Sequence, residues 1–132
     1  MIPNIMFVDD SISVLEWLQW LFIDEPYHIF TLKNPFDALS GINILEWSVV
    51  VAERHMKKMD GLEFLKKFRS RSPHTMGIIM ICYTEAADLS DKMYPDCVYE
   101  FVIKPLNHRE IKQAVKSAIR CYEINTKAKG RR

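Results

Sequence analysis

The chain has 132 residues, of which 48% are hydrophobic and 27% are charged, and its formal net charge at pH 7 is +1. This composition is typical of a globular domain and argues against disorder, while the near-neutral charge gives no reason to expect direct binding of nucleic acid. There is no apolar segment of the roughly 18 residues that a membrane span needs, and the first residues lack a signal-peptide pattern. We therefore expect a single cytoplasmic domain that does not contact membranes.

The cysteines give no sign of a disulfide framework. Cys82, Cys97 and Cys121 are an odd number and have no C-x-x-C spacing, which indicates reduced thiols.

Predicted strands and helices alternate along the whole chain. The third strand is an unbroken apolar run, which is typical of a strand buried on both faces of a parallel sheet. The predicted strands cover residues 5–8, 27–32, 48–52, 76–81 and 98–103, and the later helices cover 36–45, 61–70, 86–93 and a stretch after Asn107. Short connections between such elements predict a doubly wound α/β fold with parallel strands and crossover helices.

The first predicted helix, capped by Ser11 or Ser13, carries more apolar surface than one face can bury. Leu15, Leu18 and Phe22 form a stripe at helical spacing, but Trp17 and Trp20 extend beyond it. This extra apolar surface is either a contact surface for a partner, or tryptophan side chains that lie partly exposed against their own neighbours. Both interpretations stay open.

The C-terminal residues are polar and basic. We expect the domain to cover residues 1–124 and residues 125–132 to form a frayed basic tail or the start of a linker. A solvated tail is favoured over an arm that binds nucleic acid.

Charged side chains follow the ends of three predicted strands. Asp9 and Asp10 follow the first strand, Glu53 follows the third, and Lys104 ends the fifth. Because ligands bind outside the carboxyl ends of strands in such sheets, these side chains should meet at one edge. Carboxylates are ligands for Mg²⁺, and a lysine neutralises a phosphoryl group or pairs with a carboxylate.

At this point the chain resembles a known family. Asp9-Asp10, the pattern Met-x-x-Met-Asp-Gly at residues 56–61 and Phe-Val-Ile-Lys-Pro at residues 101–105 resemble the receiver domain of two-component response regulators. The resemblance covers about residues 4 to 123. It implies a flavodoxin-like (βα)₅ fold with strand order 2-1-3-4-5, and a non-enzymatic signalling module whose partner is a histidine kinase or an output domain or protein. A dimer is left open.

The resemblance also implies roles for individual residues. Asp9 and Asp10 would be the acidic pair, with Asp10 a direct metal ligand, and Glu53 and the backbone carbonyl of His55 would complete a Mg²⁺ site. Lys104 would contact phosphoryl oxygens. Pro105 would follow a cis peptide bond, and Phe101 falls at the aromatic switch position, although a simple core role is equally open.

Two departures from the family pattern change the functional expectation. Glu53 stands at the phosphoacceptor position, where the family has aspartate, and no aspartate occurs between Asp37 and Asp60. Cys82 stands where the family has a hydroxyl, with Thr84 nearby. For Cys82 a role as a small buried hydrophobe is the favoured alternative. In the loop after the third strand, Lys57-Lys58 replaces the common Pro-Gly. These lysines make the rim of the site, the edge of the sheet where the strands end, more basic.

These departures lead to a ranked set of hypotheses. A carboxylate displaced by about 1 Å can lose on the order of a hundredfold in rate, so phosphotransfer to Glu53 should be poor and Mg²⁺ binding weakened. The leading hypothesis is a phosphorylation-independent receiver in which Glu53, paired with Lys104, mimics an aspartyl phosphate. The alternatives are a working phosphoacceptor on Glu53 with Mg²⁺, a Glu53 that faces solvent without a partner, and a small metal-dependent phosphatase. The phosphatase is disfavoured because no nucleophile is flanked by a base.

Overall fold

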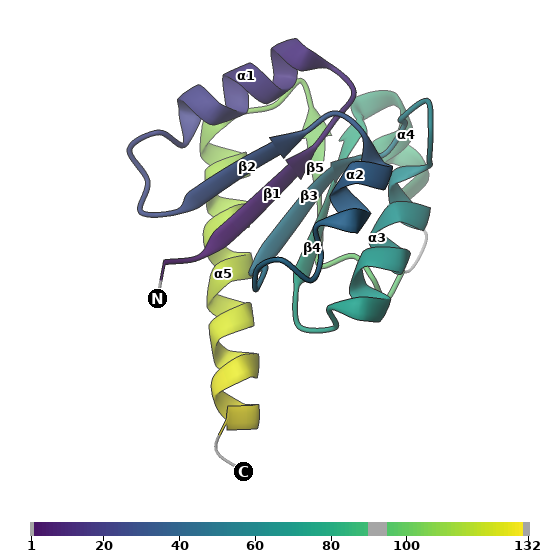
Figure 1. The fold of residues 1–132 in the computed structure, drawn as a ribbon. Helices are drawn as coiled ribbons and strands as arrows, with labels where there is room; N and C mark the ends of the chain where they lie inside the picture. The colour runs from purple at the N-terminus through teal and green to yellow at the C-terminus, as the bar shows by residue number, and fades with distance from the viewer. Residues whose placement is uncertain (1, 90–94, 131–132) are drawn as a thin grey trace.

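The computed structural model describes residues 2–89 and 95–130, and these form five parallel strands flanked by helices (Figure 1). The strand order is β2-β1-β3-β4-β5, as predicted. The strands are β1 (Asn4–Val8), β2 (His28–Leu32), β3 (Val49–Glu53), β4 (Met76–Cys82) and β5 (Glu100–Lys104). The helices are α1 (Ile12–Leu21), α2 (Pro35–Ser40), α3 (Gly61–Arg71), α4 (Tyr83–Leu89) and α5 (His108–Gly130).

The inner strands β1, β3 and β4 are buried on both faces of the sheet, which explains their apolar runs. In β3, Val49 and Val51 pack into a core under α1 and α5, while Val50 and Ala52 pack into a second core under α2 and α3. All four side chains are fully buried. Alternate residues of one strand thus serve opposite faces, as the pleat requires.

Three strands end slightly later than the sequence predicted, and this matters for the site. β3 continues to Glu53, β4 to Cys82 and β5 to Lys104. Glu53, Cys82 and Lys104 are therefore each the last residue of a hydrogen-bonded strand. Their backbones are fixed by the sheet ladder, which makes them a rigid platform for a site.

The predicted helix over residues 36–45 is too long. α2 ends at Ser40 because Gly41 caps it, with its backbone N–H donating to Ala38 O and Leu39 O. The indole N–H of Trp47 donates to the Gly41 carbonyl at 3.1 Å, so this carbonyl bonds a side chain and not a following helical turn. The fourth helix begins at Tyr83, earlier than predicted, and its predicted end at residue 93 lies outside the described residues.

Polar side chains cap the starts of α1 and α5. Ser11 caps α1, accepting a hydrogen bond from Val14 N, so the alternative cap at Ser13 is wrong. Asn107 caps α5, and its side-chain oxygen accepts from Arg109 N and Glu110 N.

The C-terminal segment is helical as far as Gly130. α5 runs to Gly130 and extends past the sheet (Figure 1). The hydroxyl of Thr126 donates to Tyr122 O at 2.8 Å, and the lysine and alanine residues that follow favour helix. The expected boundary at residue 124 therefore falls inside a continuous helix. Among the residues described, no helix is both long and apolar enough to cross a membrane.

Candidate functional site at the carboxyl end of the sheet

The strand register brings the predicted site residues to one edge of the sheet. Glu53 lies beside Met80 of β4, and Cys82 lies beside Lys104 of β5. Asp9 follows β1, and its backbone N–H donates to Leu32 O at 3.2 Å. The carboxylates of β1 and β3 therefore lie at the same end as the lysine of β5.

Lys104 joins two of these carboxylates. Its ammonium donates to Asp9 Oδ2 at 2.8 Å and lies 2.6 Å from Glu53 Oε2. Glu53 Oε2 is buried, and it forms an ion pair with the Lys104 ammonium. The side chain of Asp9 is 1% exposed and that of Glu53 is 12% exposed, so this charge cluster is largely removed from water. Glu53 therefore does not face solvent without a partner.

The lysine stays charged in this setting. Burial alone would lower the pKa of Lys104, but the adjacent carboxylates of Asp9 and Glu53 together outweigh burial and raise it above its ordinary value. The pKa of the folded state is thus higher than that of the unfolded state. The stabilisation from the lysine is complete below its ordinary pKa and is lost as the pH rises through the raised value.

The two neighbouring aspartates point to different partners. Asp9 Oδ1 accepts from Ser11 N at 2.9 Å, which ties its carboxylate to the start of α1. Asp10 is exposed, and its Oδ2 accepts from Lys57 N at 3.0 Å, which ties it to the loop after β3. Asp10 therefore stands apart from the cluster of Lys104, Asp9 and Glu53.

This divergence bears on the predicted Mg²⁺ site. Receiver domains typically bind Mg²⁺ at the phosphorylation site. Within the described residues, however, no group of three or more His, Cys, Asp or Glu side chains is placed to hold a metal ion. Asp9 and Glu53 already share a cation, the Lys104 ammonium, and Asp10 is held by the loop. The arrangement as it stands does not fit a metal ion, and the weakened Mg²⁺ site on Asp9, Asp10, Glu53 and His55 stays a prediction.

Gly61 allows α3 to begin against the back of Glu53. A Cβ at Gly61 would lie 2.1 Å from the backbone oxygen of Glu53, a contact that no side chain could make. Gly61 N donates to Arg54 O at 2.9 Å, and Arg54 also forms an ion pair with Asp60, the N-cap of α3. The glycine of the sequence motif therefore sets the position of the Glu53 backbone.

Cys82 lies at the rim and not in the core. Its side chain is exposed, so the favoured expectation of a small buried hydrophobe is wrong. The cause is that β4 carries Cys82 one residue past the buried run that ends at Ile81. The hydroxyl of Thr84 donates to its sulfur at 3.3 Å, and this hydrogen bond lowers the pKa of the Cys82 thiol.

Phe101 and Pro105 flank the lysine on β5. The Lys104–Pro105 peptide bond is cis. Phe101 is half-buried and packs against the core under α2 and α3. Whether Phe101 acts as a switch stays a prediction.

Sequence reasoning missed one contact beside the site. His55 Nε2 lies 2.6 Å from Glu85 Oε2, which links the loop after β3 to α4. The predicted start of the fourth helix at residue 86 left Glu85 in a loop, so its position at this rim could not be anticipated. The backbone N–H of His55 lies 3.4 Å from Glu53 Oε1, so His55 contacts residues on both sides.

The fold and this rim together define a class of protein. A five-stranded parallel sheet in the order 2-1-3-4-5, with an acidic pair after β1 and a lysine before a cis proline after β5, is the arrangement of flavodoxin-like receiver folds. The response regulator receiver domain matches residues 5–116, and the chain belongs to this family of two-component signalling domains.

Individual relatives agree with this assignment. The hydrogenase transcriptional regulatory protein HoxA of Cupriavidus necator is 24% identical over 116 residues, which cover 88% of this chain and 24% of HoxA. A receiver domain structure from Clostridium thermocellum has a TM-score of 0.80 at 20% identity and covers 93% of this chain and 98% of that one. A structure described as adenylate cyclase from Rhodopirellula baltica has a TM-score of 0.90 at 24% identity and covers 98% and 96%. These structural likenesses show the fold alone.

The chain spans about a quarter of the length of the curated relatives it matches, at 24% to 26% of the first three. Those relatives are regulatory proteins that contain much more than a receiver domain.

Proposed function

We propose that this receiver domain signals without being phosphorylated, because the Glu53 carboxylate, paired with Lys104, takes the place of an aspartyl phosphate. The observation that carries the proposal is the 2.6 Å contact between Glu53 Oε2 and Lys104 Nζ. In the family as a whole, the lysine at this position would contact phosphoryl oxygens. Here its ammonium is already satisfied by two carboxylates.

The chemistry at the rim disfavours phosphotransfer. Phosphorylation would require the Glu53 carboxylate to attack phosphorus, yet this carboxylate is 12% exposed and pairs with a lysine that is also bound to Asp9. Glutamate also places its oxygens about one C–C bond further out than aspartate, and misplacement by about 1 Å can cost on the order of a hundredfold in rate. The hydroxyl expected at the end of β4 is replaced by the Cys82 thiol, which is a weaker hydrogen-bond donor.

The output of such a module is a protein contact. Receiver domains interact with histidine kinases and with output domains, and we propose that this chain has a partner of this kind, in the cytoplasm. The candidate surfaces are the last two strands with their helices and the face of α1 that carries Trp20. The side chain of Trp20 is 69% exposed, whereas Leu15 and Leu18 of the same helix are buried. We propose no enzymatic activity for the domain, and a dimer through either surface is compatible with the proposal.

Treatment with a small acyl-phosphate donor tests the proposal. The full chain is incubated with acetyl phosphate and Mg²⁺, and its intact mass is measured. Glu53→Asp, which restores the usual acceptor, is the matched control and should gain one phosphoryl group, while the unmodified chain should gain none. A stoichiometric adduct on the unmodified chain that disappears in Glu53→Gln would show that Glu53 is a working phosphoacceptor, and would overturn the proposal.

A further inference from the structure

A cavity of about 490 Å³ lies beside the acidic rim, at the carboxyl end of the sheet. It is formed by the loops that follow β1, β2 and β3, and neither Glu53 nor Lys104 lines it. The cavity has the volume of a small-molecule site, for which 300 to 1,000 Å³ is typical. It is therefore a site separate from the Glu53 and Lys104 pair.

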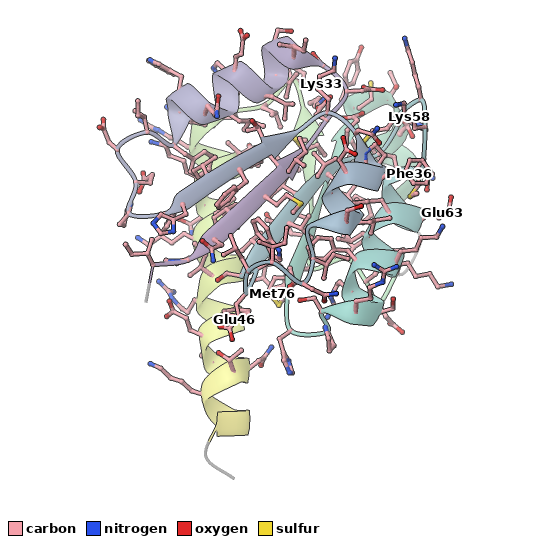
Figure 2. The ribbon with its side chains drawn as sticks, in the orientation of Figure 1. Lys33, Phe36, Glu46, Lys58, Glu63 and Met76 are labelled. Carbon is pink, nitrogen blue, oxygen red and sulfur yellow. The ribbon has the colours of Figure 1, made fainter. Side chains whose placement is uncertain are left out.

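The charges around this cavity are mainly positive. Lys33, Lys57 and Lys58 line it, and Asp10 is the one carboxylate among the lining residues. All three lysines are exposed, and within the described part of the chain none of them forms an ion pair. Figure 2 shows Lys33 and Lys58, which come from different loops, at the same end of the molecule. Three lysines face one carboxylate, so the lining carries an excess of positive charge, and the Asp10 carboxylate also accepts from the backbone N–H of Lys57.

Neutral groups in the lining add to this donor character. The Asn34 side-chain oxygen accepts a hydrogen bond from Phe36 N at 2.9 Å. The side-chain NH₂ of Asn34 is left as a donor. Pro35 and Met56 line the cavity with buried apolar atoms, which gives it a fixed wall. The cavity thus combines several hydrogen-bond donors with an apolar wall and only one carboxylate.

We propose that this cavity binds a small ligand that carries a diphosphate or triphosphate group. Lysine is a point-charge binder of phosphate, and a polyphosphate has enough anionic oxygens to reach three separate ammonium groups. A single carboxylate has only two oxygens and would leave part of the charge unpaired. The proposal does not depend on Glu53 acting as a phosphate mimic, because the two sites use different lysines.

Titration calorimetry with inorganic pyrophosphate and triphosphate tests this site on the full chain. Saturable 1:1 binding is expected, and the double variant Lys33→Gln/Lys58→Gln should weaken it by roughly tenfold or more, because two of the three cations are removed. Lys66→Gln is the matched control, since Lys66 is an exposed lysine of α3 away from the cavity. It should bind pyrophosphate as the unmodified chain does.

Amide chemical shifts locate the bound anion. Pyrophosphate should perturb the amides of residues 33–34 and 57–58, which line the cavity. The proposal is overturned by a lack of saturable binding, by equal weakening in Lys66→Gln, or by perturbations centred on Cys82 and Lys104. Tighter binding of a hexaglutamate peptide than of triphosphate would also overturn it, because the cavity would then recognise an acidic protein segment.

Discussion

The ammonium of Lys104 lies 2.6 Å from the carboxylate of Glu53, across two strand ends whose backbones are fixed by the sheet. Glu53 is the last residue of β3 and Lys104 the last of β5, and β4 separates them. The lysine side chain spans this spacing and reaches the Glu53 carboxylate, as it also reaches that of Asp9.

Loss of the lysine should destabilise the fold. Lys104→Met leaves the buried Asp9 carboxylate without its cation, and we expect a loss of about 2 to 3 kcal/mol in the free energy of unfolding, measured by urea denaturation at pH 7. This is at the lower end for buried pairs because Lys104 is 24% exposed.

Lys112→Met is the control for that measurement. It breaks the partly exposed pair of Lys112 and Glu25 and should cost less than about 1 kcal/mol. Because the pKa of Lys104 is raised in the folded state, the cost of Lys104→Met should shrink as the pH rises above about 10.4. Equal costs for the two variants at pH 7 would show that the Lys104 cluster contributes no more than a surface pair.

The close approach of α3 to Glu53 makes Gly61 sensitive to substitution. Gly61→Ala drives a Cβ into the Glu53 carbonyl, so the strand end or the helix must shift, and we expect a destabilisation of about 2 to 3 kcal/mol by thermal or urea unfolding. Gly41→Ala is the control, because a Cβ there meets its nearest atom at an ordinary 3.6 Å. That variant should be neutral or slightly stabilising. If both substitutions are neutral, Gly61 does not hold Glu53 in place.

The exposed thiol of Cys82 should react selectively. The hydrogen bond from Thr84 lowers the pKa of Cys82 below its ordinary value of 9.0, whereas burial raises the pKa of Cys97. More Cys82 is therefore thiolate near pH 8, and iodoacetamide should alkylate it before Cys97, as peptide mass mapping would show.

Thr84→Val tests the cause of that reactivity. Without the hydroxyl, the pKa of Cys82 should rise and the midpoint of its alkylation rate against pH should move to higher pH. An unchanged midpoint would mean that Thr84 does not tune the thiol.

Much of the fold could be predicted because the inner strands β1, β3 and β4 contain long apolar runs. The run that leads to Glu53 is buried on both faces, and that pattern alone predicts a parallel sheet covered by helices. The strand order, by contrast, came from the resemblance to receiver domains. Helix α2 was predicted too long because its sequence stays apolar past Ser40, and local periodicity does not reveal that Trp47 donates a hydrogen bond to the Gly41 carbonyl.

The sequence predicted which residues form the site better than it predicted which contacts they make. The sequence places Asp9, Glu53 and Lys104 at strand ends, but it does not say that Asp10 turns toward Lys57 while Asp9 turns toward Lys104. It also misplaced Cys82, which lies one residue past the buried run of β4 and is exposed. Such outcomes depend on side-chain directions at strand ends, which hydrophobic patterns do not encode.

The most direct test of the Glu53 hypothesis compares amide spectra of β5 and α5 in three samples. These are the unmodified chain, Glu53→Asp alone, and Glu53→Asp loaded with Mg²⁺ and beryllofluoride, which imitates a phosphoryl group. If Glu53 substitutes for an aspartyl phosphate, the Phe101 and Lys104 amides of the unmodified chain will match those of the loaded variant. A match to the unloaded variant would contradict the proposal, because Glu53 would then hold the domain in its unphosphorylated state.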